Sequence, residues 1–546
     1  MLGTMMHRPL RIADILTFAA ECHPDGEIVS VRTEGDVHRT TYRETALRVA
    51  QLAHALQGLG VAPGDRVATL AWNGYRHFEL YYAISGIGAV CHTINPRLSA
   101  EQMTYIVGHA GDTLLFVDTT FVPILEKLRG ELPEALRIVV MTDRAHMPGT
   151  TLDGALCYEE LLEGQDEAFD WPEFDENTAA ALCYTSGTTG EPKGALYSHR
   201  SMVLHSLIVP ISMPTVFVPG RRILPVVPLF HVNAWGLPYT APLTGASMVF
   251  PGAKLDGASV FDLMDREKVY SAWGVPTVWL GLLGEIEKRG RLPEGFGHIV
   301  VGGSAAPRPM IEKFEARGVD VCHAWGMTEM SPIGTTGQQS PAMAEWPKDR
   351  LIDWKSRQGR RVFSVDFKIV DEDGRPVPHD GKTVGELYVR GNTVIGGYFE
   401  NASATAAAMD ADGWFGTGDV AHITPDGILT ITDRAKDLIK SGGEWISSLD
   451  LENVVMAHPK VANCAVIAVP HEKWDERPLL VVAPVGEGPT KAEVDELLLK
   501  HFARWQLPDD LVLVEELPLT ATGKVSKLTL RRQFAQYQLP EQRAAV

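Results

Sequence analysis

Apolar residues follow two different spacings along the first two thirds of the chain. Residues 41–60 place apolar side chains at helical spacing, and the short apolar run at 65–70 is typical of a buried strand. Helix-like and strand-like runs follow one another again at 81–90 and 101–117. Strands that alternate with helices predict parallel sheets covered on both faces, so the expected fold class is α/β.

The pattern changes after about Leu351, where hairpin signals replace the helices. An apolar run at 367–370 precedes the turn residues 371–374, and Asp426-Gly427 has the composition of a second hairpin turn. Beyond Asp433 a charged segment leads into a further strand and helix pattern. We expect a β-rich subdomain and then a separate C-terminal domain of roughly a hundred residues.

The length and the net charge of the chain limit the classes of protein to which it can belong. The chain has 546 residues, more than one compact core holds, so at least two domains are expected. Its 50 Lys and Arg against 69 Asp and Glu leave a net charge of −19, which disfavours a protein that binds a nucleic acid polymer. A small anionic ligand would have to be held by local groups against the overall field.

Targeting signals and metal-binding patterns are missing from the sequence. Arg11 and Asp14 interrupt the apolar run that a signal peptide needs, and the 6 cysteines include no C-x-x-C pair. The most apolar stretch, 202–218, contains His205, Pro210 and Pro214, so it predicts a buried helix and no transmembrane segment. We expect a reduced, cytoplasmic protein without a structural metal.

The segment 184–194, Tyr-Thr-Ser-Gly-Thr-Thr-Gly-Glu-Pro-Lys-Gly, has a composition suited to an oligophosphate. Its glycines let backbone amides point into one concavity, its hydroxyls add donors, and Lys193 adds a positive charge. The spacing is not that of a Walker A loop, because Lys193 lies between Pro192 and Gly194. Composition alone leaves a mobile surface loop as the alternative.

Further motifs follow this loop in order along the chain. They are the aromatic-His segment 230–235, Gly302-Gly303-Ser304-Ala305, Trp325-Gly326-Met327-Thr328-Glu329, Trp414-Phe415-Gly416-Thr417-Gly418-Asp419, Asp433-Arg434-Ala435-Lys436-Asp437 and Gly523-Lys524. The whole set resembles the adenylate-forming superfamily of acyl-CoA synthetases, peptide-synthetase adenylation domains and luciferases, with most similarity to bacterial medium- and long-chain fatty acid–CoA ligases. The resemblance implies a large adenylation domain at 1–433 with a β-rich subdomain at about 351–432, and a small mobile α+β domain at 434–546 with its hinge at Lys436.

The resemblance also implies roles for single residues. Lys524 stabilises charge on the α-phosphate and the carboxylate as the acyl-adenylate forms, and Glu329 with Thr185 holds Mg²⁺. Asp419 accepts hydrogen bonds from the ribose hydroxyls, and Trp325 stacks on adenine. Taken alone, this Asp, Glu and Trp would be a turn cap, a helix-start residue and a core residue. The implied catalytic set is Lys524, Glu329, His231 and Thr185.

A larger set of residues is implied to bind the co-substrates ATP and coenzyme A. The nucleotide-binding part of the set is Thr185, Ser186, Gly187, Thr188, Thr189, Gly190, Lys193, Gly303, Ser304, Ala305, His323, Ala324, Trp325, Gly326, Met327, Thr328, Asp419 and Arg434. The hinge and the pantetheine channel add Lys436, Lys440, Ser441, Gly442, Gly443, Glu444 and Trp445. A simple helix-to-strand turn is the alternative for this second group.

The acid that is activated is less clearly indicated. Amino-acid-activating relatives carry an Asp after the aromatic-His segment, whereas residues 232–238 contain no carboxylate. The implied substrate pocket is His231, Trp235, Tyr239, Gly302 and Met327, with Trp235 at the gate of a fatty-acid tunnel. We expect AMP-forming ligation of a medium- or long-chain fatty acid to coenzyme A. The alternatives are the same chemistry on a short or substituted acid such as a thioether propanoate, and a non-catalytic scaffold.

One motif departs from the family pattern, and two partner questions stay open. Gly359-Arg360-Arg361 stands where the family has Gly-x-Pro. The basic side chains of this segment either contact the coenzyme A phosphates or lie on a solvated loop. The resemblance leaves open a homodimer through the large domain and peripheral membrane association.

Overall fold

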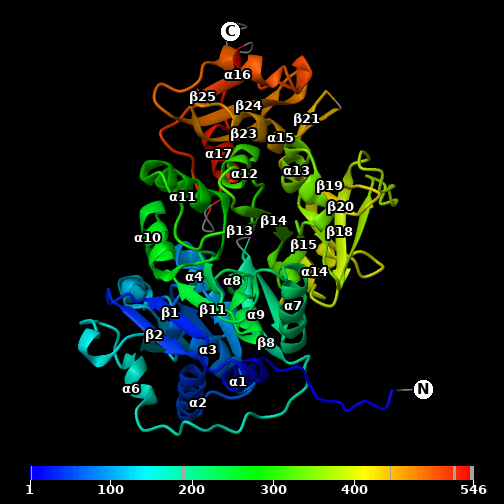
Figure 1. Ribbon diagram of the computed structural model, residues 1–546. Helices are drawn as coiled ribbons and strands as arrows, with labels where there is room; N and C mark the ends of the chain where they lie inside the picture. Colours follow the sequence, from blue (N-terminus) through cyan, green and yellow to red (C-terminus); the bar gives the residue numbers. More distant parts are fainter. Residues whose placement is uncertain (2, 186–190, 443, 521–523, 541–546) are drawn as a thin grey trace.

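The computed structural model describes residues 1, 3–185, 191–442, 444–520 and 524–540, and within these residues the strands form three sheets. Two sheets and the helices around them build the large domain, drawn from blue to yellow in Figure 1. The third sheet belongs to the small C-terminal domain, which sits on the upper end of the large domain.

The first sheet of the large domain is parallel except for its last pair, β8 and β9, which is antiparallel. In spatial order its strands are β7 (Leu156–Cys157), β6 (Arg137–Val140), β5 (Leu114–Val117), β3 (Arg66–Leu70), β4 (Val90–Thr93), β8 (Ala179–Thr185) and β9 (Lys193–Ser198). Its helices are α2 (Tyr42–Gly58), α3 (Tyr75–Gly86), α4 (Ala100–Ala110), α5 (Val122–Leu128) and α6 (Tyr158–Leu162).

Alternate strand residues of this sheet pack into different apolar clusters. Val67 and Phe116 join the cluster that contains α2, α3 and α6, whereas Ala68 and Leu115 join the one that contains α4 and α5. Both faces of the sheet are therefore covered, as the continuous apolar strands predicted. The helix predicted at 41–60 is α2, whose first turn is closed by a capping box between Thr41 and Glu44.

The second sheet is parallel in one half and antiparallel in the other. The mainly parallel half contains β2 (Val37–Thr41), β1 (Glu27–Val31), β11 (Ser247–Phe250), β10 (Arg222–Pro225), β12 (Ser271–Gly274), β13 (His298–Val301) and β14 (Asp320–Gly326). The antiparallel half contains β15 (Ile333–Thr336), β16 (Gly359–Arg361), β20 (Ile428–Arg434), β19 (Phe415–Ile423), β18 (Gly385–Gly391) and β17 (Val365–Val370). This half is the β-rich part that the hairpin signals predicted.

Helices separate the two sheets of the large domain and cover the outer face of the second. The inner group is α1 (Ile12–Cys22), α7 (His199–Ser212), α8 (Val232–Trp235) and α9 (Leu237–Thr244). The outer group is α10 (Gly257–Glu267), α11 (Pro276–Arg289), α12 (Arg308–Glu315) and α13 (Lys348–Lys355), and α14 (Ala402–Ala408) packs on β19. Single 3-10 turns are η1 (Thr119–Phe121), η2 (Arg144–His146), η3 (Thr328–Met330), η4 (Pro341–Glu345) and η5 (Arg504–Gln506).

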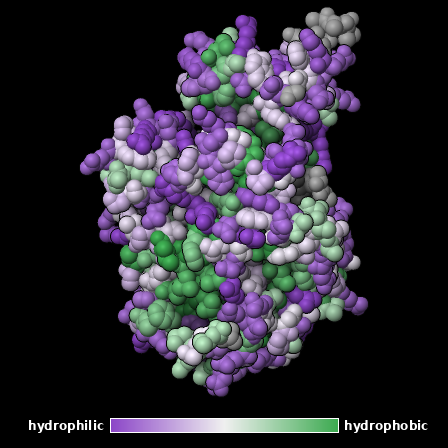
Figure 2. All heavy atoms as spheres, turned by 90° about the vertical axis from the view of Figure 1, so that its right-hand side faces the viewer, coloured by the Kyte–Doolittle hydropathy of each residue, from purple (hydrophilic) through white to green (hydrophobic). Residues whose placement is uncertain are grey.

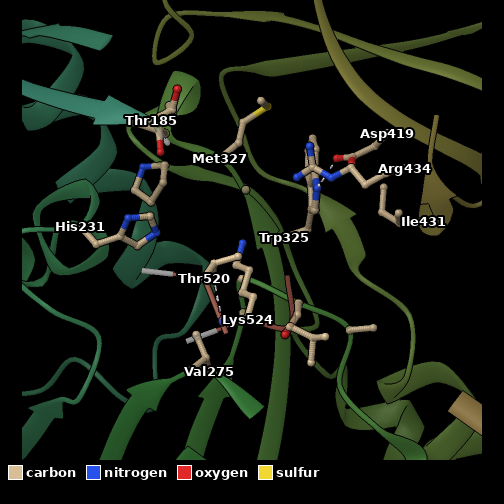
Figure 3. A pocket seen from close by; sticks show the side chains of 18 of the residues that line it. Thr185, His231, Val275, Trp325, Met327, Asp419, Ile431, Arg434, Thr520 and Lys524 are labelled. Carbon is tan, nitrogen blue, oxygen red and sulfur yellow. Dashed lines mark hydrogen bonds and ion pairs between the residues drawn. The ribbon is translucent and has the colours of Figure 1, made fainter. Parts of the chain in front are cut away.

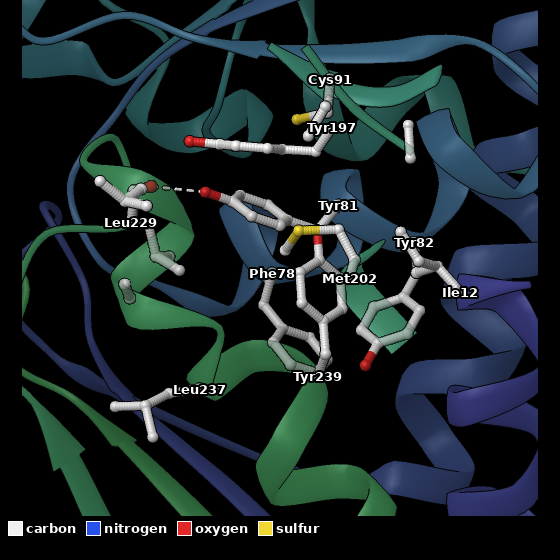
Figure 4. Close-up of a cluster of buried hydrophobic side chains, with 14 of the residues drawn as sticks. Ile12, Phe78, Tyr81, Tyr82, Cys91, Tyr197, Met202, Leu229, Leu237 and Tyr239 are labelled. Atoms are coloured by element: carbon white, nitrogen blue, oxygen red, sulfur yellow. Dashed lines mark hydrogen bonds between the residues drawn. The ribbon is translucent and has the colours of Figure 1, made fainter. Parts of the chain in front are cut away.

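Aromatic residues fill the core between the two sheets. Figure 4 shows Tyr81, Tyr82 and Tyr239 close together, and the tyrosine hydroxyls find partners, for example Tyr81 on the carbonyl oxygen of Leu229 at 2.5 Å. Such pairing removes the cost of burying a polar group, so these side chains can stay fully inside.

The helix predicted over 202–218 differs from the one observed. α7 ends at Ser212, because Pro210 and Pro214 stop the backbone ladder from continuing, and the next residues form a turn. The helix is also not buried all round: Leu207 is 43% exposed and Ile211 is 72% exposed. α7 lies at the right of Figure 1, on the side that Figure 2 turns to the viewer, where apolar side chains gather on the large domain.

The small domain is an antiparallel sheet with one parallel edge pair, β24 and β25. Its elements are β21 (Ile439–Ser441), β22 (Glu444–Ile446), α15 (Ser448–Val455), β23 (Val461–His471), β24 (Asp475–Pro484), α16 (Lys491–Leu498), β25 (Asp510–Leu513) and α17 (Lys527–Gln533). α15 and α16 pack on one face, and Leu530 of α17 packs on the other. The predicted class, α/β with a β-rich part and a small α+β C-terminal domain, is confirmed.

Candidate active site

A cleft of about 660 Å³ lies between the large domain and the small domain. It opens at the carboxyl ends of β4, β8, β12, β13 and β14, the end of an α/β sheet where ligands usually bind. The small domain closes it from above with Thr520, Lys524 and the start of α17. Figure 3 shows the labelled side chains of both domains pointing into the same space.

One end of the cleft is built by Trp325, Asp419 and Arg434. Asp419 is 2% exposed, accepts a hydrogen bond from Trp325 Nε1 at 3.0 Å, and pairs with Arg434 Nε at 2.8 Å. Burial raises the pKa of the Asp419 carboxyl, and the charge of Arg434 and the Trp325 hydrogen bond oppose this rise. The carboxylate is thus held in place beside an indole ring, an arrangement suited to a ribose next to a flat base.

The turn at the end of β13 and the strand β14 supply the wall of this end. Gly303 has φ +79°, and a Cβ at Gly326 would lie 2.0 Å from the carbonyl oxygen of Pro332, so both positions require glycine. The predicted nucleotide-binding residues that line the cleft here are Gly303, Ser304, Ala305, His323, Ala324, Trp325, Gly326, Met327 and Thr328. Burial lowers the pKa of His323 to about 4, so this imidazole is neutral.

The opposite end brings together Thr185, Lys193, Glu329 and Tyr398, all of which line the cleft. Tyr398 donates a hydrogen bond from its hydroxyl to Glu329 Oε1 at 2.8 Å, and the Lys193 ammonium lies 5.2 Å from the centre of the Tyr398 ring. Burial raises the pKa of Glu329, and the Tyr398 hydrogen bond opposes that rise.

Six of the predicted residues, Ser186, Gly187, Thr188, Thr189, Gly190 and Gly443, lie outside the described part of the chain. The strands that flank the first five, β8 and β9, pair antiparallel, with Thr185 opposite Lys193. The segment 186–190 therefore connects two strands whose ends line the cleft.

The donors near Glu329 fit Mg²⁺ only in company with a phosphate. In the described residues no group of three or more His, Cys, Asp or Glu side chains could hold a metal ion by itself. Mg²⁺ is typically held by one or two carboxylates together with substrate phosphates and water. Glu329 and the hydroxyl of Thr185 are oxygen donors of that kind at the cleft wall, so the residues present fit this cation as part of a nucleotide complex.

Lys524 reaches the centre of the cleft from the small domain. A Cβ built on Gly303 would lie 3.3 Å from Lys524 Cε and 3.8 Å from its Nζ, so the lysine passes directly over this glycine. Its backbone is held by a hydrogen bond from its N–H to Thr520 Oγ1 at 3.1 Å. Burial lowers the pKa of Lys524 to about 8, with a further lowering by Arg434 and a counteracting effect of Asp419 and Glu329.

Several contacts hold the small domain over the cleft. Asp433 at the end of β20 accepts hydrogen bonds from the N–H and the hydroxyl of Ser448, at 2.7 Å and 2.6 Å, and so caps the first turn of α15. Within the small domain itself, Arg531 of α17 pairs with Asp437 at 2.7 Å and its second nitrogen reaches the carbonyl oxygen of Lys436 at 3.4 Å, which fixes α17 to the segment after β20. Lys436 itself lines the cleft.

Four residues of the predicted substrate pocket, His231, Trp235, Gly302 and Met327, line another wall of the cleft, called the acyl side after that prediction. A Cβ at Gly302 would lie 3.0 Å from the Trp235 ring, and this ring is 6.5 Å from that of Trp273. Burial, with a smaller effect of Lys524, lowers the pKa of His231 to about 3, so its imidazole is neutral. Trp235 thus covers the glycine and closes the apolar end of the cleft.

Trp235 is carried by an unusual backbone. Residues Val232 to Trp235 all have positive φ, between 47° and 56°, which makes α8 a left-handed turn built from residues with side chains. Such a conformation costs about 1–2 kcal/mol per residue and persists only where its surroundings hold it. Asn233 is held on both sides, since its side chain accepts from the Cys183 thiol and donates to the Tyr239 hydroxyl.

Some predicted residues lie away from this cleft. Tyr239 is 0% exposed and packs among tyrosines in the core, so in this arrangement it supports the pocket from behind. Lys440, Ser441, Gly442, Glu444 and Trp445 form the β21–β22 hairpin and are not among the described residues that line the cleft. Arg360 and Arg361 pair with Asp426 and Asp366 within the β-rich half of the second sheet.

Tyr398 and Trp273 were missed as functional residues by sequence reasoning, because only the fold brings them to the cleft, and Asp433 was quoted in the 433–437 motif without a role of its own. All three line it, and Tyr398 and Asp433 also hold other lining residues or elements. A weak signal was present for one of them, since Tyr398 follows the pair Gly396-Gly397.

Comparisons with known proteins agree with this arrangement. The AMP-binding enzyme family matches residues 16–399, and the AMP-binding enzyme C-terminal domain matches residues 450–524. The chain belongs to the AMP-binding enzyme family. Within it, the 3-methylmercaptopropionyl-CoA ligase of Ruegeria lacuscaerulensis is 50% identical, over 98% of this chain and 99% of the relative. The medium-chain-fatty-acid–CoA ligase of Ectopseudomonas oleovorans is 48% identical, over 98% of both chains.

A solved structure extends the match to three dimensions. The crystal structure of the anthranilate CoA ligase AuaEII in complex with anthranoyl-AMP superposes with a TM-score of 0.85 at 25% identity, covering 99% of both chains. This AMP-binding enzyme is therefore an AMP-forming acid–CoA ligase that uses ATP and coenzyme A, and the predicted superfamily is confirmed. Among its described helices none is long and apolar enough to cross a bilayer.

Proposed function

We propose that this enzyme joins an aliphatic carboxylic acid to the α-phosphate of ATP and then transfers the acyl group to coenzyme A. The observation that carries the proposal is Lys524 of the small domain, which lies over Gly303 in the cleft that Asp419 and Glu329 line. An ammonium group there faces the space between the two ends of the cleft.

The six free cysteines support a reducing, cytoplasmic location.

In the first step an oxygen of the carboxylate attacks the α-phosphorus, and the bond from that phosphorus to pyrophosphate breaks. Asp419 and Trp325 hold the nucleoside, so the α-phosphate falls near Lys524, whose positive charge stabilises the charge that develops there. Lys193, which lines the cleft beside Thr185, faces the β- and γ-phosphates. A bound Mg²⁺, held by Glu329 and phosphate oxygens, would neutralise part of the negative charge of pyrophosphate.

In the second step the thiolate of coenzyme A attacks the acyl carbon, and AMP leaves. Lys524 and its neighbours cover the cleft in the observed arrangement, so we propose that the small domain pivots at Lys436 between the two steps. The pivot withdraws Lys524 and brings the β21–β22 hairpin, with Lys440 to Trp445, toward the entrance. The boundary between the moving parts lies at the end of β20, at residues 433–434.

We propose a medium- or long-chain fatty acid as the first candidate for the acid. Among the described residues, the wall on this side carries no carboxylate to pair with an amino group. The residues behind Trp235, among them Trp273 and Phe217, are apolar. A long tail would have to displace the Trp235 ring from Gly302. The relative from Ectopseudomonas oleovorans, named for medium-chain fatty acids, supports this candidate.

A short acid, including a thioether propanoate, is the second candidate. The Trp235 ring over Gly302 closes the pocket as observed, and a short tail fits without moving it. The relative from Ruegeria lacuscaerulensis is named for such an acid. Each methylene that is buried contributes about 0.8 kcal/mol, or roughly a fourfold change in affinity, so chain length is a sharp test.

The test is a chain-length series from propanoate to palmitate, with methylthiopropanoate included, in which AMP, pyrophosphate and acyl-CoA are measured. We expect equal amounts of the three products and dependence on coenzyme A. A kcat/KM maximum at eight carbons or more would support the first candidate, and a maximum at the short acids would support the second. Formation of ADP in place of AMP would overturn the mechanism.

A further inference from the structure

The phosphate end of the cleft holds two opposite charges that do not meet. Among the described residues no ion pair joins Lys193 to Glu329, although both line the same wall. The ring of Tyr398 lies beside the Lys193 ammonium at 5.2 Å, and its hydroxyl reaches Glu329 at 2.8 Å. One side chain therefore contacts both charged groups.

The backbone around Tyr398 is fixed to the same two segments. Phe399 N–H donates to the carbonyl oxygen of Gly194, next to Lys193, at 2.8 Å, and Ile395 N–H donates to the carbonyl oxygen of Glu329 at 2.9 Å. Tyr398 N–H donates to Thr405 Oγ1, in the middle of α14, at 2.9 Å. The segment 395–399 is therefore bonded both to β9, which contains Gly194, and to η3, which contains Glu329.

This geometry has a physical consequence for the two charges. A lysine and a glutamate on one low-dielectric wall attract each other strongly. In a direct ion pair, neither the carboxylate nor the ammonium would be available to bind a ligand. The aromatic face offers the ammonium a weaker partner, and the phenol hydroxyl orients the carboxylate. Both groups then stay available for a ligand that carries phosphates and a divalent cation.

We propose that Tyr398 is a positioning residue that keeps Lys193 and Glu329 apart. Its ring holds the Lys193 ammonium in place for the phosphates, and its hydroxyl orients the Glu329 carboxylate for the divalent cation. This inference rests on the proposed function, since it assumes that ATP with a divalent cation binds at this end of the cleft. It assigns separate tasks to the two parts of one side chain, and two variants can separate them.

The test measures binding in the full-length protein, without turnover. The affinity for a non-hydrolysable ATP analogue is measured by titration calorimetry with Mg²⁺ and, separately, with EDTA, and Mn²⁺ binding to the analogue complex is followed by electron paramagnetic resonance. Tyr398→Phe removes the hydroxyl and keeps the ring. We expect it to weaken binding in Mg²⁺ about tenfold, as for other residues that orient a metal ligand, and to change binding in EDTA less than about twofold. Tyr398→Leu should weaken binding under both conditions.

Tyr388→Phe is the matched control, because Lys368 lies 5.3 Å from the Tyr388 ring in a similar contact and neither residue lines the described cleft. This control should bind as the wild type does. In the double variant Tyr398→Phe with Glu329→Gln, the loss in Mg²⁺ should equal that of Glu329→Gln alone, because both changes act on the same carboxylate.

Three outcomes would overturn the proposal: no change in Tyr398→Phe, an equal loss with and without Mg²⁺, or additive losses in the double variant. A thermal unfolding curve of each variant shows whether it is folded under the assay conditions. If the wild type itself binds no ATP analogue in Mg²⁺, the proposed function fails, and that result is distinct from a failure of the Tyr398 variants.

Discussion

At the scale of single residues, the site works because burial changes what each group can do. Lys524 sits in a closed cleft, and its pKa falls to about 8. His231, on the acyl side, has a pKa of about 3 and stays neutral. A neutral imidazole suits a wall for an uncharged tail, whereas the lysine near pH 8 is poised between its charged and neutral forms.

The first prediction concerns pH. The Lys524 ammonium is present below its pKa and is lost above it, so kcat/KM for adenylate formation should fall as the pH rises through about 8. Pyrophosphate exchange between pH 6.5 and 9.5 measures this limb. Lys524→Arg keeps its charge throughout, so any activity that remains should no longer fall near pH 8; the same falling limb in this variant would contradict the assignment.

The second prediction concerns Trp235. Trp235→Ala removes the ring that closes the acyl end, so kcat/KM should rise for longer acids and fall for short ones, by roughly fourfold per methylene of altered contact. The chain-length series measures it. Trp505→Ala is the control, because Trp505 is 45% exposed and is not among the described residues that line the cleft. An unchanged length profile in Trp235→Ala would mean that another residue sets the limit.

At the scale of elements, strand ends and helix starts place the chemistry. The carboxyl ends of β8 in the first sheet and of β13 and β14 in the second place Thr185, Gly303 and Trp325 in the wall of one cleft. Sequence periodicity predicted the strands β3 and β5 and the helix α2, because a buried strand and a half-buried helix each impose a clear pattern of apolar residues. The end of α7 and the left-handed turn α8 could not be predicted that way, since neighbouring contacts and prolines decide them.

The third prediction belongs to the junction between β20 and α15. Asp433 caps α15 from the neighbouring strand, so Asp433→Ala should destabilise the observed docking by about 1–2 kcal/mol, which lowers adenylate formation roughly tenfold. Thioester formation from supplied acyl-adenylate should be unchanged or faster. Asp426→Ala, at an exposed turn of the large domain, is the control. Equal losses in both half-reactions of Asp433→Ala would indicate a general folding defect.

At the scale of the whole molecule, a protein with a net charge of −19 can bind anionic co-substrates because positive side chains are placed in the cleft. Lys193, Arg434, Lys436 and Lys524 all line the cleft, so the positive charges gather where phosphates would lie. Acidic side chains, among them Glu329 and Asp419, line the same cleft, so a phosphate would be held by the placement of these single cations.

The fourth prediction follows from the pivot of the small domain. The Ser448 N–H donates to Asp433 across the junction, so its hydrogen exchange should be slow with a stable acyl-adenylate analogue bound. Addition of coenzyme A should speed exchange in residues 446–452 several-fold as the small domain leaves this position. Hydrogen exchange with mass spectrometry measures it. Exchange that does not respond to coenzyme A would argue against a pivot at this junction.

The sequence by itself determined the fold class and the family, because motifs such as the 325–329 segment combine residue types that only a few chemistries need together. Most of the described residues that these motifs pointed to line one cleft. It did not determine which side chains meet across the cleft. Tyr398 lies 69 positions from Glu329, and Lys524 lies far along the chain from Gly303. Such contacts depend on how sheets, turns and domains pack, so only the tertiary structure decided that Trp235 covers Gly302 and that Tyr398 contacts both Lys193 and Glu329.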